Sequence, residues 1–158
     1  MEKHYVRLPS SATNAATARE WRELGFFYDT DESERTWNLV GSRSGLLKFM
    51  QLLRNYGDNP QRADVSEHDH YGPYAYLKIV TWHEPAITQH DIRGTKTDLR
   101  HLADVIERGL ASTTVGECIE IDTDYSQQNE FRLRLQLRGD DFDPASADPL
   151  LPTSALKQ

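Results

Sequence analysis

The chain has one cysteine in 158 residues, Cys118, and no long apolar run. A single cysteine excludes a disulfide within the chain, which fits a reducing compartment, so we expect a cytoplasmic protein. Residues 1–10 lack the apolar core of a secretory signal. No segment approaches the ~20 apolar residues that a transmembrane helix requires, so we expect no membrane partner.

Basic residues are also scarce, because 18 lysines and arginines face 25 aspartates and glutamates, giving a formal net charge of −7. The excess is marked in residues 115–158, where nine acidic residues accompany four basic ones. An acidic surface repels phosphate backbones, so we expect no nucleic-acid partner. It suits a basic protein, because complementary fields accelerate encounter. The simpler interpretation is that the charge only keeps the protein soluble.

Familiar catalytic motifs are missing too. The chain has no GxSxG elbow, no phosphate-binding GxxxxGK[ST] or GxGxxG loop, and no HExxH or CxxC pair. Cys118 opens an apolar strand, where we expect a small core residue rather than a nucleophile. The acidic residues are spread over loops, so no carboxylate pair for acid–base chemistry stands out. We therefore expect a protein that is not an enzyme.

The length predicts one domain, residues 1–150, followed by a loosely ordered tail, residues 151–158. Apolar spacing predicts an N-terminal helix and two amphipathic helices, which begin near Ser42 and Thr95. Alternation and β-forming residues predict strands at 4–8, 25–29, 36–40, 73–82, 86–93, 118–122 and 130–138. The expected fold is α+β, with a mainly antiparallel sheet of about six strands and the two amphipathic helices on one face, plus the N-terminal helix.

Two segments of the chain are similar at a shift of 53 residues, so that Gly41 and Ser42 align with Gly94 and Thr95. Each segment reads as a strand, a glycine, a hydroxyl cap and an amphipathic helix. The glycine is expected to let the chain turn sharply from strand to helix. The similarity predicts two equivalent helices, although any two strand-to-helix junctions obey the same physics.

The segment from residue 67 to residue 74 joins a polar loop to an aromatic strand and is the candidate partner-binding site. Exposed tyrosines bury a large area at low entropic cost, which is typical of binding surfaces. Alternatively, its tyrosines only pack the end of the sheet. The candidate partner-binding residues are Glu67, His68, Asp69, His70, Tyr71 and Tyr74.

The same segment carries the alternative hypothesis, a metal-dependent hydrolase that uses the His-rich loop 67–70. His68 and His70 share one face if the segment is extended. A zinc site needs three or four converging ligands, however, and the spacing gives no reason for His83 or His90 to join them. We therefore expect neither a metal nor another cofactor.

Three segments of the sequence resemble a family of small bacterial proteins. They are WNLVGSRSGLL from Trp37, EHDHYGPY from Glu67 and FDPASAD from Phe142. The chain resembles, over about residues 20–150, the immunity protein 32 family, whose members accompany toxins of polymorphic or contact-dependent secretion systems. The resemblance implies a protein that binds and neutralises a cognate toxin. The acidic charge of the chain leads us to expect a basic toxin, for example a nuclease, and we expect the protein to be a monomer or a homodimer. We further expect that charge reversal at Glu67 and Asp69 weakens toxin binding.

Overall fold

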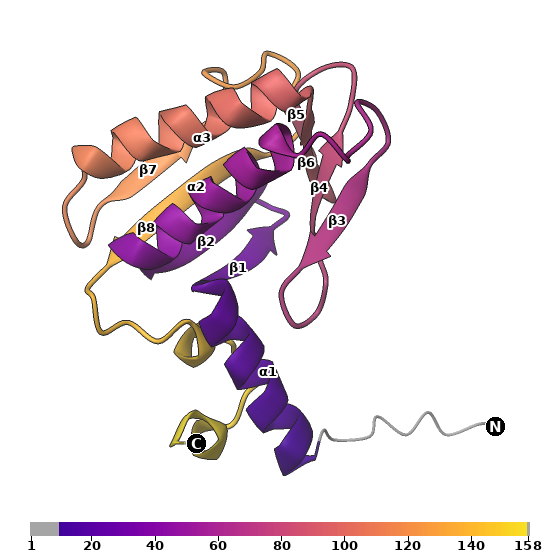
Figure 1. Ribbon diagram of the computed structural model, residues 1–158. Coiled ribbons are helices and arrows are strands. Elements are labelled where there is room, and N and C mark those ends of the chain that lie inside the picture. The colour runs from indigo at the N-terminus through magenta and orange to yellow at the C-terminus, as the bar shows by residue number, and fades with distance from the viewer. Residues whose placement is uncertain (1–9, 158) are drawn as a thin grey trace.

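The computed structural model describes residues 10–157, which form an α+β fold, so the predicted fold class is confirmed (Figure 1). The helices of this part of the chain are α1 (Ser11–Leu24), α2 (Arg43–Asp58), α3 (Lys96–Ala111) and two short 3-10 helices, η1 (Pro144–Ala147) and η2 (Thr153–Lys157). The strands are β1 (Phe26–Asp31), β2 (Thr36–Ser42), β3 (His68–Tyr71), β4 (Leu77–Thr81), β5 (Ala86–Ile87), β6 (Asp91–Gly94), β7 (Cys118–Ile121) and β8 (Arg132–Arg138). No helix of residues 10–157 is long and apolar enough to cross a membrane.

The strands form two four-stranded sheets, in the orders β1-β2-β8-β7 and β3-β4-β6-β5. Each sheet consists of two antiparallel hairpins that meet through a central parallel pair, β2 with β8 and β4 with β6. The predicted single, mainly antiparallel sheet of about six strands is therefore wrong. Alternation along a strand identifies the strand but not its partner, and β8 returns to β2 only after the whole second sheet has been made.

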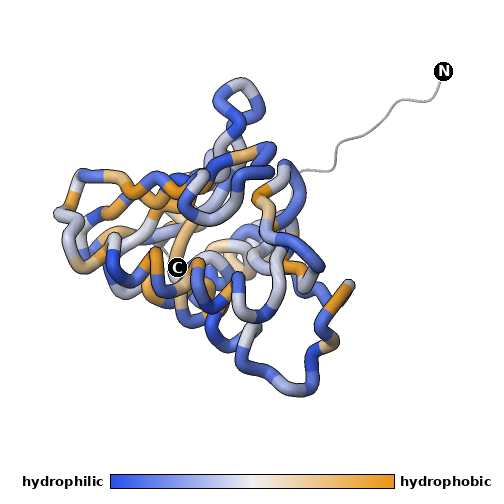
Figure 2. Tube along the Cα trace, turned by 90° about the horizontal axis from the view of Figure 1, so that it is seen from above, coloured by the Kyte–Doolittle hydropathy of each residue, from blue (hydrophilic) through white to orange (hydrophobic). Residues whose placement is uncertain are grey.

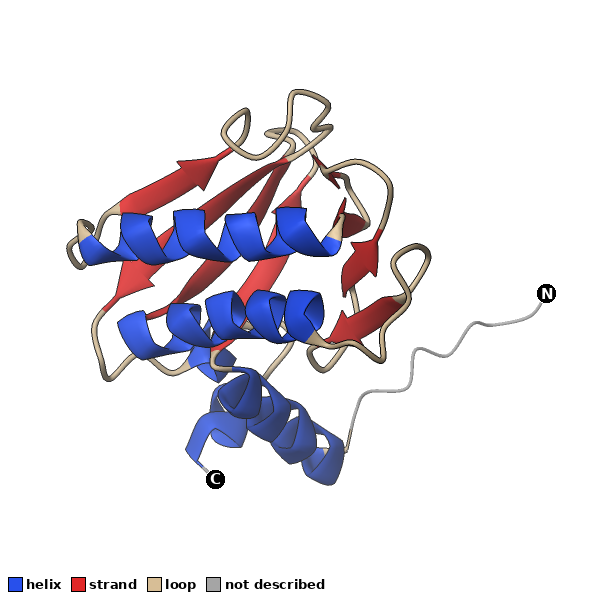
Figure 3. Cartoon of the chain, turned by 45° about the horizontal axis from the view of Figure 1, so that its top comes forward, coloured by secondary structure: helices blue, strands red, loops and turns tan. Residues whose placement is uncertain are grey.

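Helices α2 and α3 lie side by side over the strands (Figure 3). They run antiparallel, since Arg43 at the start of α2 donates to the carbonyl of Leu110 near the end of α3. At the opposite end, Arg100 donates to the carbonyl of Gly57. Arg54 pairs with Asp104 across the two exposed faces at 2.7 Å. The two amphipathic helices that the sequence predicts are thus neighbours.

The hydroxyl caps of both helices are as predicted. Ser42 Oγ accepts from the amide of Gly45, and Thr95 forms a reciprocal capping box with Asp98. We expected the glycine before each cap to permit a sharp turn, but neither Gly41 nor Gly94 has a positive φ, so backbone conformation does not explain either glycine. A Cβ at position 94 would lie 2.4 Å from Tyr125 Oη, so close packing requires glycine there.

Hydrophobic residues recur along the helices and strands, whereas the connecting loops are mostly hydrophilic (Figure 2). The alternation of β8 is confirmed, because Leu133, Leu135 and Leu137 are fully buried while Arg134 and Gln136 between them are partly exposed. Cys118 is exposed, contrary to the expected core position. Strand β7 is at the edge of its sheet, and the inward-facing positions are taken by Ile119, which is partly buried, and Ile121, which is buried, so Cys118 faces outward.

Several element boundaries differ from the predictions. The strand expected at 73–82 begins only at Leu77, because residues 72–76 form a turn with positive φ at Gly72 and Ala75. The strand expected at 86–93 divides into β5 and β6, and the strand expected at 4–8 lies outside the described residues. Residues 151–157, expected as a loosely ordered tail, include η2, whose Ala155 is buried.

Candidate functional site

One tyrosine on β1 ties the edges of the two sheets together. The hydroxyl of Tyr28 donates to the carbonyl of Tyr71 at the end of β3. It accepts from the amides of Tyr76 at 3.1 Å and Leu77 at 3.2 Å. Burial raises the pKa of Tyr28 above its usual value, which keeps this hydroxyl protonated as a donor. The turn 72–76 is therefore held against β1, beside the upper end of α1 (Figure 1).

A buried carboxylate organises the neighbouring aromatic rings. Asp148, which is 4% exposed, accepts on one oxygen from the indole of Trp21 at 2.9 Å and from the hydroxyl of Tyr74 at 2.6 Å. Its other oxygen accepts from the amide of Leu150 at 2.9 Å. All three donors are neutral, and no ion pair of Asp148 occurs within residues 10–157. Burial, followed by the bond to Asp148, raises the pKa of Tyr74.

These contacts enclose a cavity of about 410 Å³ between α1, β1, the turn 72–76 and residues 148–150. We call it the aromatic pocket; its lining residues are Trp21, Phe27, Tyr28, Asp29, Thr30, Trp37, Tyr74, Tyr76, Gln89, His90, Asp148, Pro149 and Leu150. The ring of Trp21 lies 5.1 Å from that of Tyr28 and 6.0 Å from that of Tyr74. Tyr76 is 68% exposed and Leu150 is 72% exposed, so the pocket presents apolar surface to solvent.

The β1–β2 hairpin adds negative charge beside this pocket. Asp29 is exposed and lines the pocket, and Asp31 and Glu32 follow it along the chain. None of the three forms an ion pair among the residues that the structure describes, whereas Glu34 pairs with Arg132 at 3.5 Å. The pocket therefore combines aromatic walls with an acidic rim.

The structure divides the predicted partner-binding segment between two places. Tyr74 lines the aromatic pocket, as described above. Glu67 and Asp69 turn instead toward Arg62, which approaches Glu67 at 3.8 Å and also bonds to Asp69. The guanidinium of Arg62 lies 4.0 Å from the centre of the Tyr56 ring, and burial raises the pKa of Tyr56 to about 12. Both carboxylates thus have a partner within the chain.

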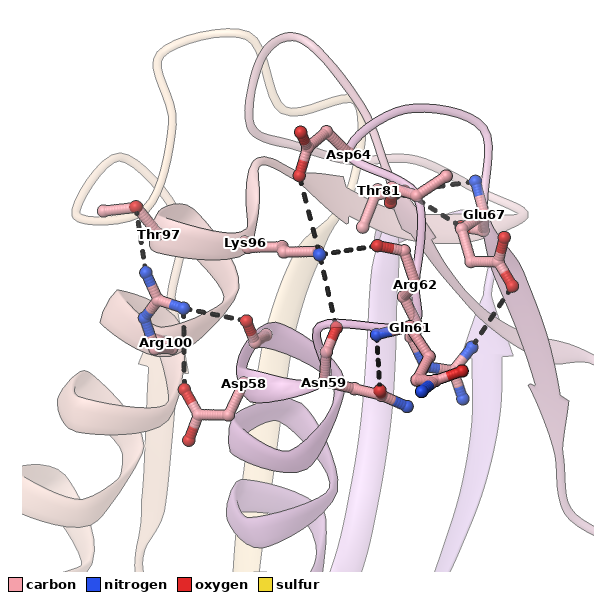
Figure 4. A network of polar contacts seen from close by, with 12 residues as sticks. Asp58, Asn59, Gln61, Arg62, Asp64, Glu67, Thr81, Lys96, Thr97 and Arg100 are labelled. Atoms are coloured by element: carbon pink, nitrogen blue, oxygen red, sulfur yellow. Dashed lines mark hydrogen bonds and ion pairs between the residues drawn. The ribbon is translucent and has the colours of Figure 1, made fainter.

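Lys96 at the start of α3 fastens the loop that carries Arg62 (Figure 4). Its ammonium donates to the carbonyls of Asn59 at 3.2 Å and Arg62 at 2.5 Å, and it lies 3.5 Å from a carboxylate oxygen of Asp64. The loop is therefore anchored to the helical layer, which explains how a polar segment can hold β3 in place without an apolar stripe.

His68 and His70 are exposed on β3, with ring centres 5.4 Å apart. Nδ1 of His70 lies 3.0 Å from the carbonyl of Ala75. Residues 10–157 contain no group of three or more histidine, cysteine, aspartate or glutamate side chains that could hold a metal ion. The hydrolase alternative for loop 67–70 therefore finds no arranged ligand set in this part of the chain.

Most of the residues of the aromatic pocket could not be recognised from the sequence. Trp21, Tyr28, Tyr76 and Asp148 come from four separate segments, and the bond from Trp21 to Asp148 spans 127 positions. The sequence did contain one indication of the pocket, the run of three aromatic residues from Phe26 to Tyr28. Successive side chains of a strand point to opposite faces, so these three cannot all face one core.

The chain matches no family model, no curated protein and no solved structure.

Proposed function

We propose that the protein is an immunity protein that binds and neutralises a cognate bacterial toxin by covering its active or substrate-binding surface. The observation that carries the proposal is the aromatic pocket with its exposed apolar mouth and acidic rim. The resemblance of three sequence segments to immunity proteins supports the same function.

The composition of this surface suits tight protein binding. Binding energy concentrates on a few aromatic side chains that become fully desolvated in the complex. Tyr76 is such a candidate, since most of its surface reaches solvent while its neighbour Tyr74 is fixed by Asp148. The net charge of −7 would speed the encounter with a basic toxin such as a nuclease.

The remaining residues of the predicted segment belong to the same proposal. His68 and His70 are exposed on β3, next in sequence to the turn that carries Tyr74. Glu67 and Asp69 keep about two fifths of their side chains exposed, so they can meet a partner while paired with Arg62. A charge reversal there would also break contacts within the chain, so it tests the interface only alongside a stability measurement.

The test is co-expression with the toxin encoded beside this protein, read as growth rescue and as co-purification. Replacing both Tyr76 and Leu150 with alanine should abolish rescue, because the mouth of the pocket loses its exposed apolar surface. Val115→Ala is the matched control, since Val115 is also exposed but precedes β7, at the opposite edge of the sheet from β1. Absence of rescue and of binding by the unaltered protein would refute the proposed function.

A further inference from the structure

We infer that the aromatic pocket is a receptor for a guanidinium group, presented by an arginine of the basic partner. The inference rests on the proposed function in one respect: it assigns the arginine to the toxin. The preference of the pocket for a cation rests on the pocket itself, and it can be measured without a toxin.

The walls of the pocket are suited to a cation. Aromatic faces carry negative charge density and attract cations within about 6 Å, tryptophan most strongly. Five aromatic residues besides Phe27 line the cavity: Trp21, Tyr28, Trp37, Tyr74 and Tyr76. Neither lysine nor arginine is among the described residues that line it.

Asp148 supplies a buried acidic group that forms no ion pair within residues 10–157. A buried carboxylate is normally paired with a cation or fully hydrogen-bonded, because its desolvation is otherwise expensive. Asp148 meets the second condition through neutral donors on Trp21, Tyr74 and Leu150. A cation in the pocket would meet this acidic group across poorly hydrated surroundings, where the attraction between opposite charges is stronger than in water.

A guanidinium fits these surroundings better than an ammonium. It is planar, weakly hydrated and stacks on aromatic faces, whereas an ammonium is compact and strongly hydrated. The chain stacks its own arginines in this way, since Arg62 lies over Tyr56 and Arg93 lies 5.5 Å from the centre of the Trp82 ring. At the rim, the exposed carboxylate of Asp29 is available for the remaining donors of the guanidinium.

The experiment titrates three small probes into the isolated protein: n-butylguanidinium, n-butylammonium and the neutral n-butylurea. Binding is followed by the indole N–H resonances, because two of the three tryptophans line the pocket, whereas Trp82, which follows β4, does not. We expect n-butylguanidinium to bind about 5- to 30-fold more tightly than n-butylurea, and more tightly than n-butylammonium. The resonance of Trp82 should not move.

Two substitutions test which acidic residues produce the preference for n-butylguanidinium. Asp148→Asn retains an oxygen that can accept from Trp21 and Tyr74 but removes the charge, so it should abolish most of the preference over n-butylurea. Asp29→Asn alters an exposed side chain with little risk to folding, and it should weaken guanidinium binding a few-fold at low salt and less at high salt. Asp140→Asn, at another exposed position outside the pocket, is the control.

The outcomes separate this inference from the proposed function. If n-butylurea binds as tightly as n-butylguanidinium, or no probe shifts Trp21 and Trp37, the guanidinium site is refuted even where the toxin binds. If the guanidinium preference is present and the toxin neither binds nor is neutralised, the site stands and the proposed function falls.

Discussion

The hydroxyl of Tyr28 is the contact whose removal tests the structure most directly. Tyr28→Phe deletes one oxygen and leaves the ring in place beside Trp21. The change deprives three main-chain groups of a partner: the carbonyl of Tyr71 and the amides of Tyr76 and Leu77. These groups belong to β3, β4 and the turn between them, so the substitution loosens the junction of the two sheets without creating a large cavity.

The expected loss follows from the burial of each group. A buried polar group without a partner costs about 1–3 kcal/mol. Leu77 is fully buried, so its amide bears this cost in full, whereas Tyr76 is largely exposed and its amide can turn to water. Tyr71 is half-buried, so its carbonyl bears part of the cost. We expect Tyr28→Phe to lower the free energy of unfolding by about 2–4 kcal/mol, a large share of the 5–15 kcal/mol typical of a domain.

Urea denaturation followed by tryptophan fluorescence measures this loss as a lower midpoint at unchanged slope. Tyr76→Phe is the matched control, because it removes a hydroxyl from an exposed tyrosine in the same turn, and it should change stability by less than about 0.5 kcal/mol. A loss below that value for Tyr28→Phe would show that the hydroxyl does not join the sheets, and it would refute the junction.

Three further predictions follow from the same contacts. Gly72→Ala should destabilise the protein by more than Gly116→Ala, by about 1–3 kcal/mol in urea denaturation, because both positions have positive φ but only a Cβ at 72 would lie within 3 Å of Tyr28. The hydrogen bond from Arg22 holds the pKa of Asp143 below its usual 3.8, so this pair stabilises the fold above that pH, and the stabilisation is lost as the pH falls further. Asp143→Asn should therefore lower the free energy of unfolding, measured by urea denaturation, by up to about 1 kcal/mol at pH 7 and by less at pH 3, unlike Asp140→Asn. Arg62→Met should destabilise β3, because the loop loses its bonds to Glu67 and Asp69. Hydrogen exchange would show this as faster exchange of the amides of residues 68–71. Unchanged exchange would argue that the loop holds β3 by its main chain alone.

The sequence predicted the elements whose signals are local. The spacing of apolar residues and the capping residues identified α2 and α3, and the strict alternation of β8 identified both its buried and its solvent-facing side. Strand pairing was not predictable in this way, because the chain completes the second sheet before β7 and β8 return to the first. Strand β3 escaped prediction for another reason: its residues, His-Asp-His-Tyr, are polar, and ion pairs and main-chain bonds hold it rather than an apolar stripe.

The residues of the candidate site were still harder to predict, because they come from distant segments of the chain. The sequence identified Tyr74, which lies in a polar–aromatic segment, but not Trp21 or Asp148, which acquire a role only when α1 meets the residue that follows η1. Each of these residues has an ordinary local context, a helix face for Trp21 and the end of a short 3-10 helix for Asp148. A site built from distant segments leaves no periodic pattern in any one of them.

Tyr28 belongs both to the junction of the sheets and to the wall of the aromatic pocket, and this double position couples folding to binding. Its ring packs against Trp21, and its hydroxyl fixes the turn that carries Tyr74 and Tyr76. Any ligand that orders this turn must favour the state in which the Tyr28 hydroxyl is bonded. Such a ligand therefore stabilises the whole domain by an amount set by its concentration relative to its affinity. Tyr28→Phe should then weaken guanidinium binding although its ring is retained, because the turn is no longer held in the binding arrangement before the cation arrives.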